Sequence, residues 1–522
     1  MSSDSLVLAR ARIVELRAAL EADEKAPVRL IETHISWVLV GAARAYKLKK
    51  PVRLPFLDFT ELESRRHFCA EELRLNRRLA PDLYLDVVEV RQGPSGPRFG
   101  GVEGELVDVA VRMRRLPDGA LWSERVAAKT LLATHVDALA SRLAGFHAGA
   151  DVATASSRHG SMAVHERVAA RLIAAVDAWQ AVAVRPDPGW PGVRGWLGEE
   201  LHRLEPFWSA RREQGRIREC HGDLHLANIV QIGEESTAFD AVEFDAELRW
   251  IDVLDDLAFA VMDLLAHGLR GFAFRLLDGW LERSGDHAGL PGLRYFLVCR
   301  ALVRASVAVL AQAQGVAATT SGAAGDYLRL AGELASARDP RLAITHGLPG
   351  AGKTVASGRL LEAAGAIRIR SDVERKRLFG LSALQSSGEG ASAGIYGPAA
   401  TRATYAALRA AARTALESGW PAIVDAAFLR RSERAAFAGL AASLGAPFTI
   451  VDCRAGVPLL YQRVADRRSR ADDASEADTA VLGRLLEIAE PLDAGEQAAA
   501  LVVEAERPPP PQDLAARWLA AR

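Results

Sequence analysis

Several residue types are scarce in this sequence, and each scarcity excludes a class of protein. The four cysteines, Cys69, Cys220, Cys299 and Cys453, lie far apart and include no C-x-x-C pair. This spacing indicates neither a disulfide framework nor a zinc site, so we expect a protein of the reducing cytoplasm. The sequence has no uncharged apolar run of about 18 residues, and charged residues interrupt its N-terminal segment. We therefore expect neither a membrane span nor a signal peptide.

An excess of charge of one sign is missing as well. The chain has 65 lysines and arginines against 66 aspartates and glutamates, which gives a formal net charge of −1. This balance provides no overall positive field for a nucleic acid or an anionic membrane, and we expect neither as a partner. The composition is that of a globular protein, and its 522 residues exceed the roughly 250–300 that one hydrophobic core supports. At least two domains are expected.

Lysine and asparagine are also rare: the chain has seven lysines and two asparagines, Asn76 and Asn228. Lysine carries a compact point charge, whereas arginine presents a flat fork of hydrogen-bond donors. Because arginine provides nearly all of the positive charge, each lysine that remains indicates a specific requirement. Lysines and asparagines are therefore the first candidates for site residues.

The order of predicted helices and strands divides the chain near residue 338, where Asp339-Pro340 interrupts a helical run. We predict a first domain at 1–338, with a strand-rich lobe at about 1–116 and a mostly helical lobe at about 117–338. Residues 339–522 alternate strand and helix, which is typical of a parallel sheet covered by helices. The predicted strand-rich stretches are 27–50 and 84–116 in the first domain, and the strands of the second are 341–346, 366–370, 421–426 and 447–452.

The strongest motif of the second domain is GLPGAGKT, which has the pattern G-x-x-x-x-G-K-T between a predicted strand and a predicted helix. The backbone N–H groups of such a loop and the positive end of its helix cradle nucleotide phosphates. We expect Lys353 to reach the β- and γ-phosphates and Thr354 to bind Mg²⁺. The predicted nucleotide-binding residues of this loop are Gly347, Leu348, Pro349, Gly350, Ala351, Gly352, Lys353 and Thr354.

Charged residues follow other predicted elements of the second domain. Asp372 lies at a strand end, where a carboxylate can accept the proton of an acceptor hydroxyl; the alternative is a helix N-cap. Asp425 ends the next strand, in a Walker-B-like position for Mg²⁺ or its water, with a strand-end cap as the alternative. Arg463 and Arg467 are four residues apart and share a helix face suited to clamping phosphates. A solvated basic helix is the alternative for these two arginines.

Residues 341–500 resemble the group of small P-loop kinases that includes gluconate kinase, polynucleotide kinase and zeta-toxin-like enzymes. In that group a strand-end aspartate is the catalytic base and a lid supplies arginines. The resemblance therefore assigns the base to Asp372 and nucleotide contacts to Arg463 and Arg467. It leaves the acceptor open, because the group phosphorylates sugars, nucleic-acid ends and other molecules.

In the first domain, the segment CHGDLHLANIV contains H-x-D-x-x-x-x-N, with Asp223 and Asn228 at the spacing of a kinase catalytic loop. We expect Asp223 to orient the acceptor hydroxyl and take its proton, and Asn228 to bind Mg²⁺. The following strand ends in TAFDAVEFD. Asp240 is the expected second metal ligand, and Glu243 and Asp245 remain alternatives.

An ATP-binding kinase also pairs a strand lysine with a helix glutamate. The strand AYKLKK offers Lys47 and Lys49 on one face, because side chains alternate along a strand. We prefer Lys47, which closes the hydrophobic part of the strand. The helix predicted at 61–80 offers Glu71 and Glu72, and we prefer Glu72 because leucines three and seven residues later anchor its face.

Residues 27–335 resemble the kinase-like fold of aminoglycoside phosphotransferases and choline kinases. They depart from protein kinases in having no G-x-G-x-x-G loop, since Thr33-His34-Ile35-Ser36 stands in its place. The whole chain resembles bacterial proteins that fuse such a domain to a P-loop kinase-like domain. The expected fold is a bilobal, α+β kinase-like domain followed by an α/β P-loop NTPase domain with a parallel sheet and flanking helices.

These resemblances imply an ATP-dependent phosphotransferase with two nucleotide sites, which uses ATP and Mg²⁺. Its acceptors are expected to be hydroxyl groups of small molecules such as sugars or aminoglycoside-like compounds. One alternative is a regulatory protein in which one domain is a catalytically silent nucleotide switch. Another is a nucleic-acid end kinase in the second domain.

Overall fold

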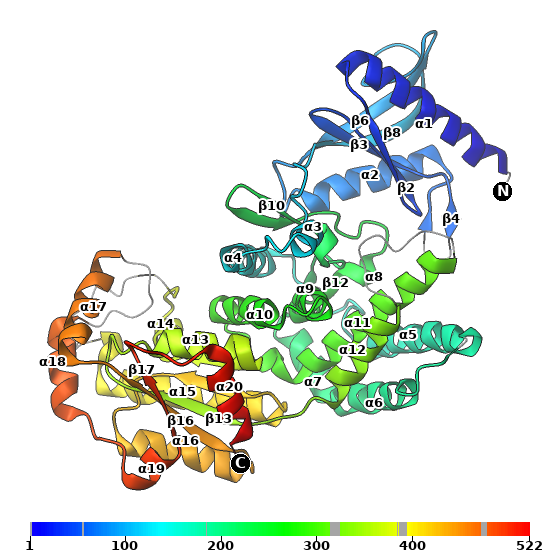
Figure 1. Ribbon diagram of the computed structural model, residues 1–522. Helices are drawn as coiled ribbons and strands as arrows, with labels where there is room; N and C mark the ends of the chain where they lie inside the picture. The colour runs from blue at the N-terminus through cyan, green and yellow to red at the C-terminus, as the bar shows by residue number, and fades with distance from the viewer. Residues whose placement is uncertain are drawn as a thin grey trace. The chain divides into compact units, whose positions relative to one another are not determined.

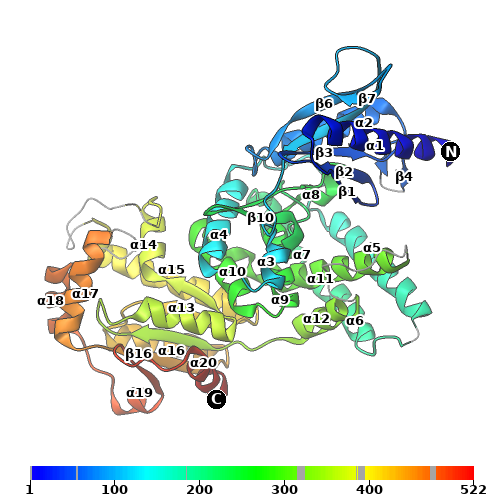
Figure 2. The same ribbon diagram turned by 45° about the horizontal axis from the view of Figure 1, so that its top comes forward.

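The computed structural model describes residues 3–54, 57–183, 185–313, 324–383, 385, 394–470 and 478–521. The chain forms two compact units, each discontinuous in sequence. The N-terminal unit contains residues 1–161 and 211–256, and the C-terminal unit contains residues 162–210 and 257–522. Figures 1 and 2 show their elements in two views. The C-terminal unit thus contains residues on both sides of position 338, and a domain boundary at that position stays a prediction.

The N-terminal unit is built on a six-stranded antiparallel sheet with the strand order β1-β2-β3-β8-β6-β7. The strands are β1 (Arg29–Glu32), β2 (Ser36–Val40), β3 (Arg44–Lys49), β6 (Tyr84–Gly93), β7 (Gly96–Phe99) and β8 (Glu105–Arg114), beside a small hairpin of β4 (Arg53–Leu54) and β5 (Leu57–Asp58). The two predicted strand-rich stretches are confirmed. The segment predicted as a turn between β6 and β8 also contains the short strand β7.

Two helices, α1 (Ser3–Glu24) and α2 (Leu62–Asn76), contribute to the two hydrophobic clusters of this sheet. One cluster contains Tyr46 and Leu48 of β3 together with apolar residues of α1. The other contains Ala45 of β3 and Cys69 of α2. Because side chains alternate along a strand, Lys47 lies on the same face as Ala45 and so faces α2. Burial of each large apolar side chain stabilises this arrangement by about 1.5–3 kcal/mol.

The rest of the N-terminal unit carries the predicted catalytic loop between two short strands. Its elements are α3 (Trp122–Ala127), α4 (Ala133–Gly149), β9 (Ile217–Glu219), η1 (Leu226–Asn228), β10 (Ile229–Ile232), β11 (Glu235–Ala238), α8 (Ala246–Arg249) and β12 (Trp250–Asp252). Strands β10 and β11 form an antiparallel hairpin, and β9 pairs with β12. The loop 220–228 therefore begins at the end of β9 and ends at the start of β10.

Helices form the first part of the C-terminal unit, as predicted for this region. They are α5 (Met162–Val182), α6 (Trp190–Arg203), α10 (Arg270–Ser284), η2 (His287–Gly289), α11 (Leu290–Ala313) and α12 (Ala324–Ser336). Helices α7 (Glu205–Glu213) and α9 (Val253–Ala266) contain the positions where the chain passes from one unit to the other. Within the described ranges, no helix is both long and apolar enough to cross a lipid bilayer.

The second part of the C-terminal unit is a five-stranded parallel sheet with the order β14-β15-β13-β16-β17. The strands are β13 (Leu342–His346), β14 (Ile367–Arg370), β15 (Ala422–Asp425), β16 (Phe448–Arg454) and β17 (Ala500–Glu504). The four predicted strands are confirmed, and β17 was not predicted. In such a sheet the carboxyl ends of the strands meet at one edge, so the residues that follow them gather there.

Helices accompany this parallel sheet, as Figures 1 and 2 show. They are α13 (Lys353–Ala364), α14 (Ser371–Leu378), η3 (Gly394–Tyr396), α15 (Pro398–Glu417), α16 (Arg431–Ser443), α17 (Val457–Arg470), α18 (Thr479–Ile488), α19 (Ala494–Ala498) and α20 (Pro511–Ala520). The antiparallel and parallel sheets together confirm the predicted fold class: a kinase-like first part and a P-loop second part.

Candidate active sites

The loop between β13 and α13 needs glycine at three positions. Gly347, Gly350 and Gly352 have φ angles of 139°, 86° and 90°, which side chains other than glycine rarely adopt. A β-carbon at Gly347 would lie 2.4 Å from the carbonyl oxygen of Cys453. The loop therefore lies directly against the strand β16, with no room for a larger residue. This backbone is the one that the motif predicts for phosphate binding.

Two of the predicted phosphate-binding cations contact this loop. Lys353 donates from Nζ to the carbonyl oxygen of Leu348, at 3.0 Å. Arg463, which α17 carries, donates to the carbonyl oxygen of Gly350, at 3.1 Å. Arg467 lies on the same helix, but its side chain is outside the described part of the structure. The loop is thus flanked by a lysine and an arginine from distant parts of the sequence.

Asp425 ends β15 at the same edge of the sheet. Its carboxylate is buried and accepts hydrogen bonds from Ser357 (3.2 Å) and Thr345 (3.4 Å). The Ser357 hydroxyl also donates to the carbonyl oxygen of Thr354, at 3.1 Å. Ser357 therefore links the two residues predicted to hold Mg²⁺. We had not predicted a role for Ser357, although its position one helical turn after Thr354 was a usable signal.

Asp372 lies in the first turn of α14, but it does not cap that helix. The N-cap position belongs to Arg370, and no side chain accepts a capping hydrogen bond there. The alternative interpretation of Asp372 as an N-cap is therefore wrong. Its half-buried carboxylate makes no hydrogen bond or ion pair with any residue that the structure describes. A carboxylate without a structural partner at the carboxyl edge of the sheet can accept a proton from a ligand.

In the N-terminal unit, two lysines of β3 meet three carboxylates. Glu72 lies between the lysines, with one oxygen 2.9 Å from Nζ of Lys47 and the other 2.8 Å from Nζ of Lys49. Lys47 also forms an ion pair with Asp240, and Lys49 forms one with Glu243. The predicted lysine, glutamate and acidic residue thus come together, and the alternatives Lys49 and Glu243 form a second pair beside them.

Exposure and charge distinguish the two pairs. The side chains of Lys49 and Glu72 are fully buried, whereas Lys47 is 11 % exposed and Asp240 40 % exposed. Burial alone would lower the pKa of Lys47, but Asp240 and Glu72 raise that pKa well above its ordinary value. Burial likewise opposes ionisation of Glu72, but the two lysines lower the pKa of Glu72 to about 2. All these groups are charged at neutral pH, and the Lys47–Asp240 pair is the one that a ligand can reach.

The remaining alternatives lie elsewhere. Glu71 forms ion pairs with Arg74 (2.7 Å) and Arg249 (2.9 Å), so it faces away from the lysines. Asp245 accepts a hydrogen bond from the backbone N–H of Glu247, at 2.8 Å, and caps α8. Their neighbours in the structure leave Glu72 and Asp240 as the candidates beside Lys47.

The catalytic-loop residues are held by hydrogen bonds within the loop and to the segment before Asp240. The Asn228 amide donates to the carbonyl oxygen of Asp223 (2.9 Å) and to its carboxylate (3.1 Å). The backbone N–H of Phe239 donates to the carbonyl oxygen of Asn228, at 3.0 Å, and Nε2 of His221 lies 2.9 Å from the Phe239 carbonyl oxygen. These bonds bring the loop that carries Asp223 against the segment that carries Asp240.

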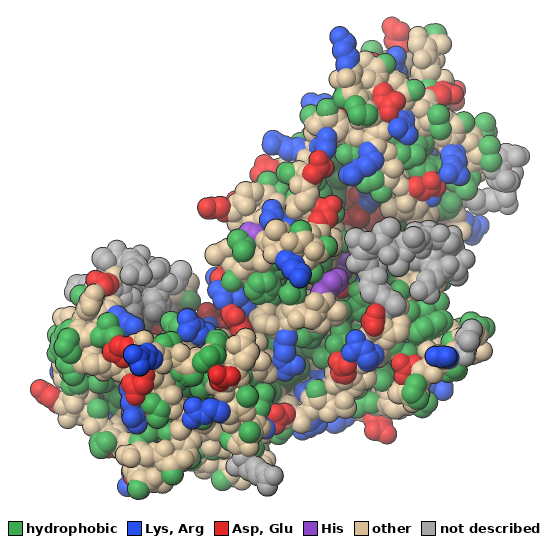
Figure 3. All heavy atoms as spheres, in the orientation of Figure 1, with side chains coloured by type: hydrophobic (Ala, Val, Ile, Leu, Met, Phe, Trp, Pro, Cys, Tyr) green, Lys and Arg blue, Asp and Glu red, His purple; other side chains and the backbone are tan. Residues whose placement is uncertain are grey.

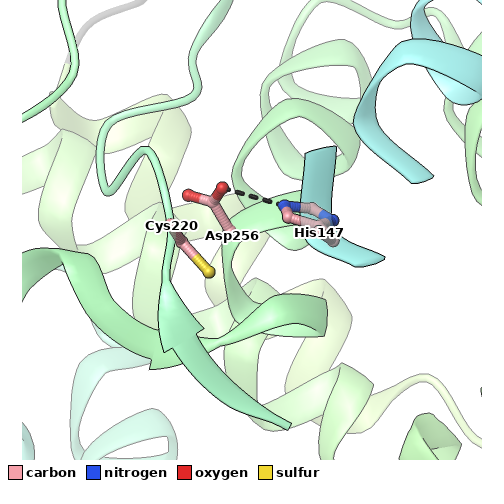
Figure 4. A group of neighbouring side chains, drawn as sticks. All are labelled: His147, Cys220 and Asp256. Atoms are coloured by element: carbon pink, nitrogen blue, oxygen red, sulfur yellow. Dashed lines mark hydrogen bonds and ion pairs between the residues drawn. The ribbon is translucent and has the colours of Figure 1, made fainter. Parts of the chain in front are cut away.

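Asp256 braces the same loop from below (Figure 4). Its carboxylate accepts from the backbone N–H groups of His221 (3.1 Å) and Gly222 (2.8 Å), and Nε2 of His147 lies 3.1 Å away. Burial opposes ionisation, but these partners lower the pKa of Asp256 to about 2. His147, Cys220 and Asp256 lie close enough to suggest a metal site. Burial keeps the Cys220 thiol protonated by raising its pKa, and both oxygens of Asp256 are bonded, so we interpret the group as a structural brace.

Two residues that we had not predicted connect α2 to the Asp240 segment. Asn76 donates to the carbonyl oxygen of Glu72 (2.8 Å) and accepts from the backbone N–H of Ala241 (2.9 Å). The Tyr84 hydroxyl accepts from the backbone N–H of Asp240, at 3.1 Å. Asp240 has a φ angle of 64°, which is uncommon for a residue with a side chain. The scarcity of asparagine was the signal that could have identified Asn76.

The turn between β1 and β2 stands where protein kinases have a glycine-rich loop. Thr33 and Ser36 close it with two hydrogen bonds: the N–H of Thr33 donates to the Ser36 carbonyl (2.9 Å), and the N–H of Ser36 donates to the Thr33 hydroxyl (3.0 Å). The turn is therefore short and bonded to itself.

Comparison with known proteins places these sites among similar sequences. Residues 342–492 match a family described as an AAA domain. Uncharacterized protein Rv2004c of Mycobacterium tuberculosis (strain ATCC 25618 / H37Rv) is 30 % identical over 456 residues, which cover 86 % of this chain and 88 % of that protein.

Among solved structures, a gluconokinase from Sinorhizobium meliloti 1021 is similar over 35 % of this chain and 91 % of its own, with 21 % identity and a TM-score of 0.24. A choline/ethanolamine kinase family protein from Mesorhizobium loti is similar over 62 % of this chain and 92 % of its own, with 14 % identity and a TM-score of 0.35. These similarities agree with the two resemblances found in the sequence.

Proposed function

We propose that this chain, which belongs to the family of the mycobacterial protein Rv2004c, is an ATP-dependent phosphotransferase with two nucleotide sites. Each site would transfer the γ-phosphate of ATP to a hydroxyl group of a small molecule. One observation supports both assignments: each unit gathers a lysine for phosphates, acidic residues for Mg²⁺ and a half-exposed carboxylate for the acceptor. The identity of the acceptors is left to experiment.

In the C-terminal unit, the backbone of the 347–352 loop and Lys353 would bind the phosphates, with Arg463 beside them. Thr354 and Asp425 are the residues that would hold Mg²⁺, and Ser357 keeps them together. When bound, Mg²⁺ neutralises negative charge on the transferring phosphoryl group. Asp372 would accept the proton of the acceptor hydroxyl.

In the N-terminal unit, Lys47 would contact the phosphates, and its ion pair with Glu72 would hold it in place. Asn228 and Asp240 would be the Mg²⁺ ligands. Asp223 would orient the acceptor hydroxyl and take its proton. The 2.9 and 3.1 Å bonds from the Asn228 amide support this role, because they fix the position of Asp223.

A second candidate function for the N-terminal unit is that of a nucleotide-binding switch without transfer activity. The self-bonded turn at Thr33–Ser36 favours it, because this turn offers no glycine-rich cover for phosphates. A nucleic-acid acceptor has less support. On the face drawn in Figure 3, basic and acidic side chains of the described residues are interspersed rather than gathered by sign.

The test is a screen of full-length protein against pools of hydroxyl-containing metabolites, with ATP consumption as the readout. Asp223→Ala and Lys353→Ala variants assign each positive pool to the N-terminal or the C-terminal site. The proposal expects at least one pool whose ATP consumption is lost in one of these variants. ATP binding by neither site, measured by calorimetry in the presence of Mg²⁺, would overturn it.

A further inference from the structure

Helix α10 is part of the C-terminal unit and packs against the first helix and the edge strand of the P-loop sheet, α13 and β14. It precedes residue 338 and lies outside the segment 342–492 that matches the AAA domain family. Asp278 and Glu282 are four residues apart on α10, so they share one helix face. Both carboxylates meet arginines of β14.

Arg368 connects this helix face to the P-loop. Its guanidinium binds the carboxylate of Asp278 with two hydrogen bonds, of 2.6 and 3.2 Å, and that of Glu282 with one, of 3.1 Å. From its other nitrogen it donates to the carbonyl oxygen of Thr354, at 3.2 Å. Thr354 is one of the two residues proposed to hold Mg²⁺. One buried side chain thus contacts both α10 and the start of the nucleotide-binding helix.

Arg370 lies between the helix face and the second proposed metal ligand. It donates to Glu282 at 3.3 Å, and its Nε lies 3.8 Å from the carboxylate of Asp425. Arg370 and Asp425 are register partners in the neighbouring parallel strands β14 and β15. Glu282 and Asp425 therefore share one guanidinium.

The charges of this cluster leave one carboxylate in excess. Asp278, Glu282 and Asp425 provide three negative charges, and Arg368 and Arg370 provide two positive charges. All five side chains are at most 17 % exposed, so water screens these charges less than it screens surface pairs. Without the two carboxylates of α10, the cluster would carry a net positive charge next to Asp425 and would repel a divalent cation.

We propose that Asp278 and Glu282 are positioning residues of the P-loop site: they hold Arg368 and Arg370 and balance their charge, so that Asp425 stays available to Mg²⁺. This inference rests on the proposed function, because it assumes that Asp425 and Thr354 hold Mg²⁺. Its consequence is that the P-loop site is completed by a helix from outside the P-loop segment. The site is thus built from both sides of position 338.

The experiment measures ADP binding to the full-length protein with Mg²⁺ and with EDTA, and takes the ratio of the two affinities. The component that is lost in Lys353→Ala is assigned to the P-loop site. Glu282→Gln removes one negative charge from the cluster and should reduce the ratio at least about tenfold, with little change in EDTA. Arg370→Gln removes one positive charge and should raise the ratio.

The double variant Glu282→Gln/Arg370→Gln restores the net charge of the cluster, so its ratio should return toward the parent value. A purely structural role of the ion pair predicts the opposite, namely that the double variant is no better than Glu282→Gln. Glu362→Gln is the matched control, because Glu362 forms a 2.6 Å ion pair with Arg275 of α10 but is not bonded to the cluster. It should leave the ratio unchanged.

The outcomes are distinguishable. An unchanged ratio in Glu282→Gln, or no recovery in the double variant, overturns the positioning role but leaves the proposed function intact. If Glu282→Gln does not fold, Arg370→Gln decides alone, because a ratio that fails to rise contradicts the charge argument. ADP binding that Lys353→Ala leaves unaffected would overturn both the proposed P-loop site and this inference.

Discussion

Lys353 is the one lysine of the P-loop, and its Nζ lies within hydrogen-bond distance of the loop backbone, 3.0 Å from the Leu348 carbonyl. We predict that Lys353→Ala lowers nucleotide affinity at this site at least about 100-fold, because the amide groups remain but the charge on the β- and γ-phosphates is lost. Calorimetric titration of the full-length protein with ADP and Mg²⁺ measures the change. Arg359→Ala is the control, since Arg359 is an exposed cation on the same helix. Equal losses in both variants would contradict the assignment.

Asp372 provides a second test at the scale of one residue. The aspartate has no structural partner among the described residues, so Asp372→Asn should preserve folding and ATP binding. The amide cannot accept a proton, and we predict that phosphoryl transfer at the C-terminal site falls about 10²- to 10⁴-fold. Single-turnover transfer with an acceptor from the screen measures the rate. Transfer at the parent rate would show that Asp372 is not the base.

At the scale of elements, the loop 220–228 depends on Asp256 at the start of α9. The pKa of Asp256 in the folded protein is about 2, below the 3.8 of an ordinary aspartate, because donors from the loop and His147 outweigh burial. A carboxylate with a lowered pKa stabilises the fold above its unfolded pKa, and this contribution disappears as the pH falls through the folded pKa. The shift corresponds to about 2 kcal/mol at neutral pH.

We therefore predict that Asp256→Asn is less stable than the parent at pH 6, and that the difference shrinks by about 1 kcal/mol by pH 3. Urea unfolding at a series of pH values measures the two free energies of unfolding. Asp118→Asn serves as the control, because the Asp118 side chain is 78 % exposed and should show no such trend. A constant difference between parent and Asp256→Asn across this range would contradict the assigned role of the carboxylate.

At the scale of the whole molecule, the two sites use separate residues, so their effects should be separable. We predict a calorimetric stoichiometry of two ATP per chain, and of one in Lys353→Ala. Asp223→Ala should keep both binding events, because Asp223 is assigned to the acceptor, and should lose only the N-terminal transfer reaction. A parent stoichiometry of one that disappears in Lys353→Ala would show that the N-terminal unit does not bind ATP. The switch interpretation and the two-kinase interpretation would then both fail for that unit.

Local signals explain most of what could be predicted from the sequence. The segment GLPGAGKT and the spacing from Asp223 to Asn228 lie within single loops, and a loop imposes its own geometry through its glycines and hydrogen bonds. Strands of the parallel sheet were predicted for a similar reason, because they are short apolar runs bounded by turns. The strand β17 was missed, since ALVVE near the C-terminus is too short to stand out.

The sequence by itself determined the fold class, the two phosphate-site motifs and the residue types available to each site. Only the tertiary structure decided which of two neighbouring glutamates faces Lys47, and that Asp278 and Glu282 join the P-loop site. Adjacent residues on a helix differ by about 100° in direction, and sequence alone does not say which direction meets a distant strand. Contacts between distant segments depend on how helices and sheets pack, and that packing is a property of the whole chain.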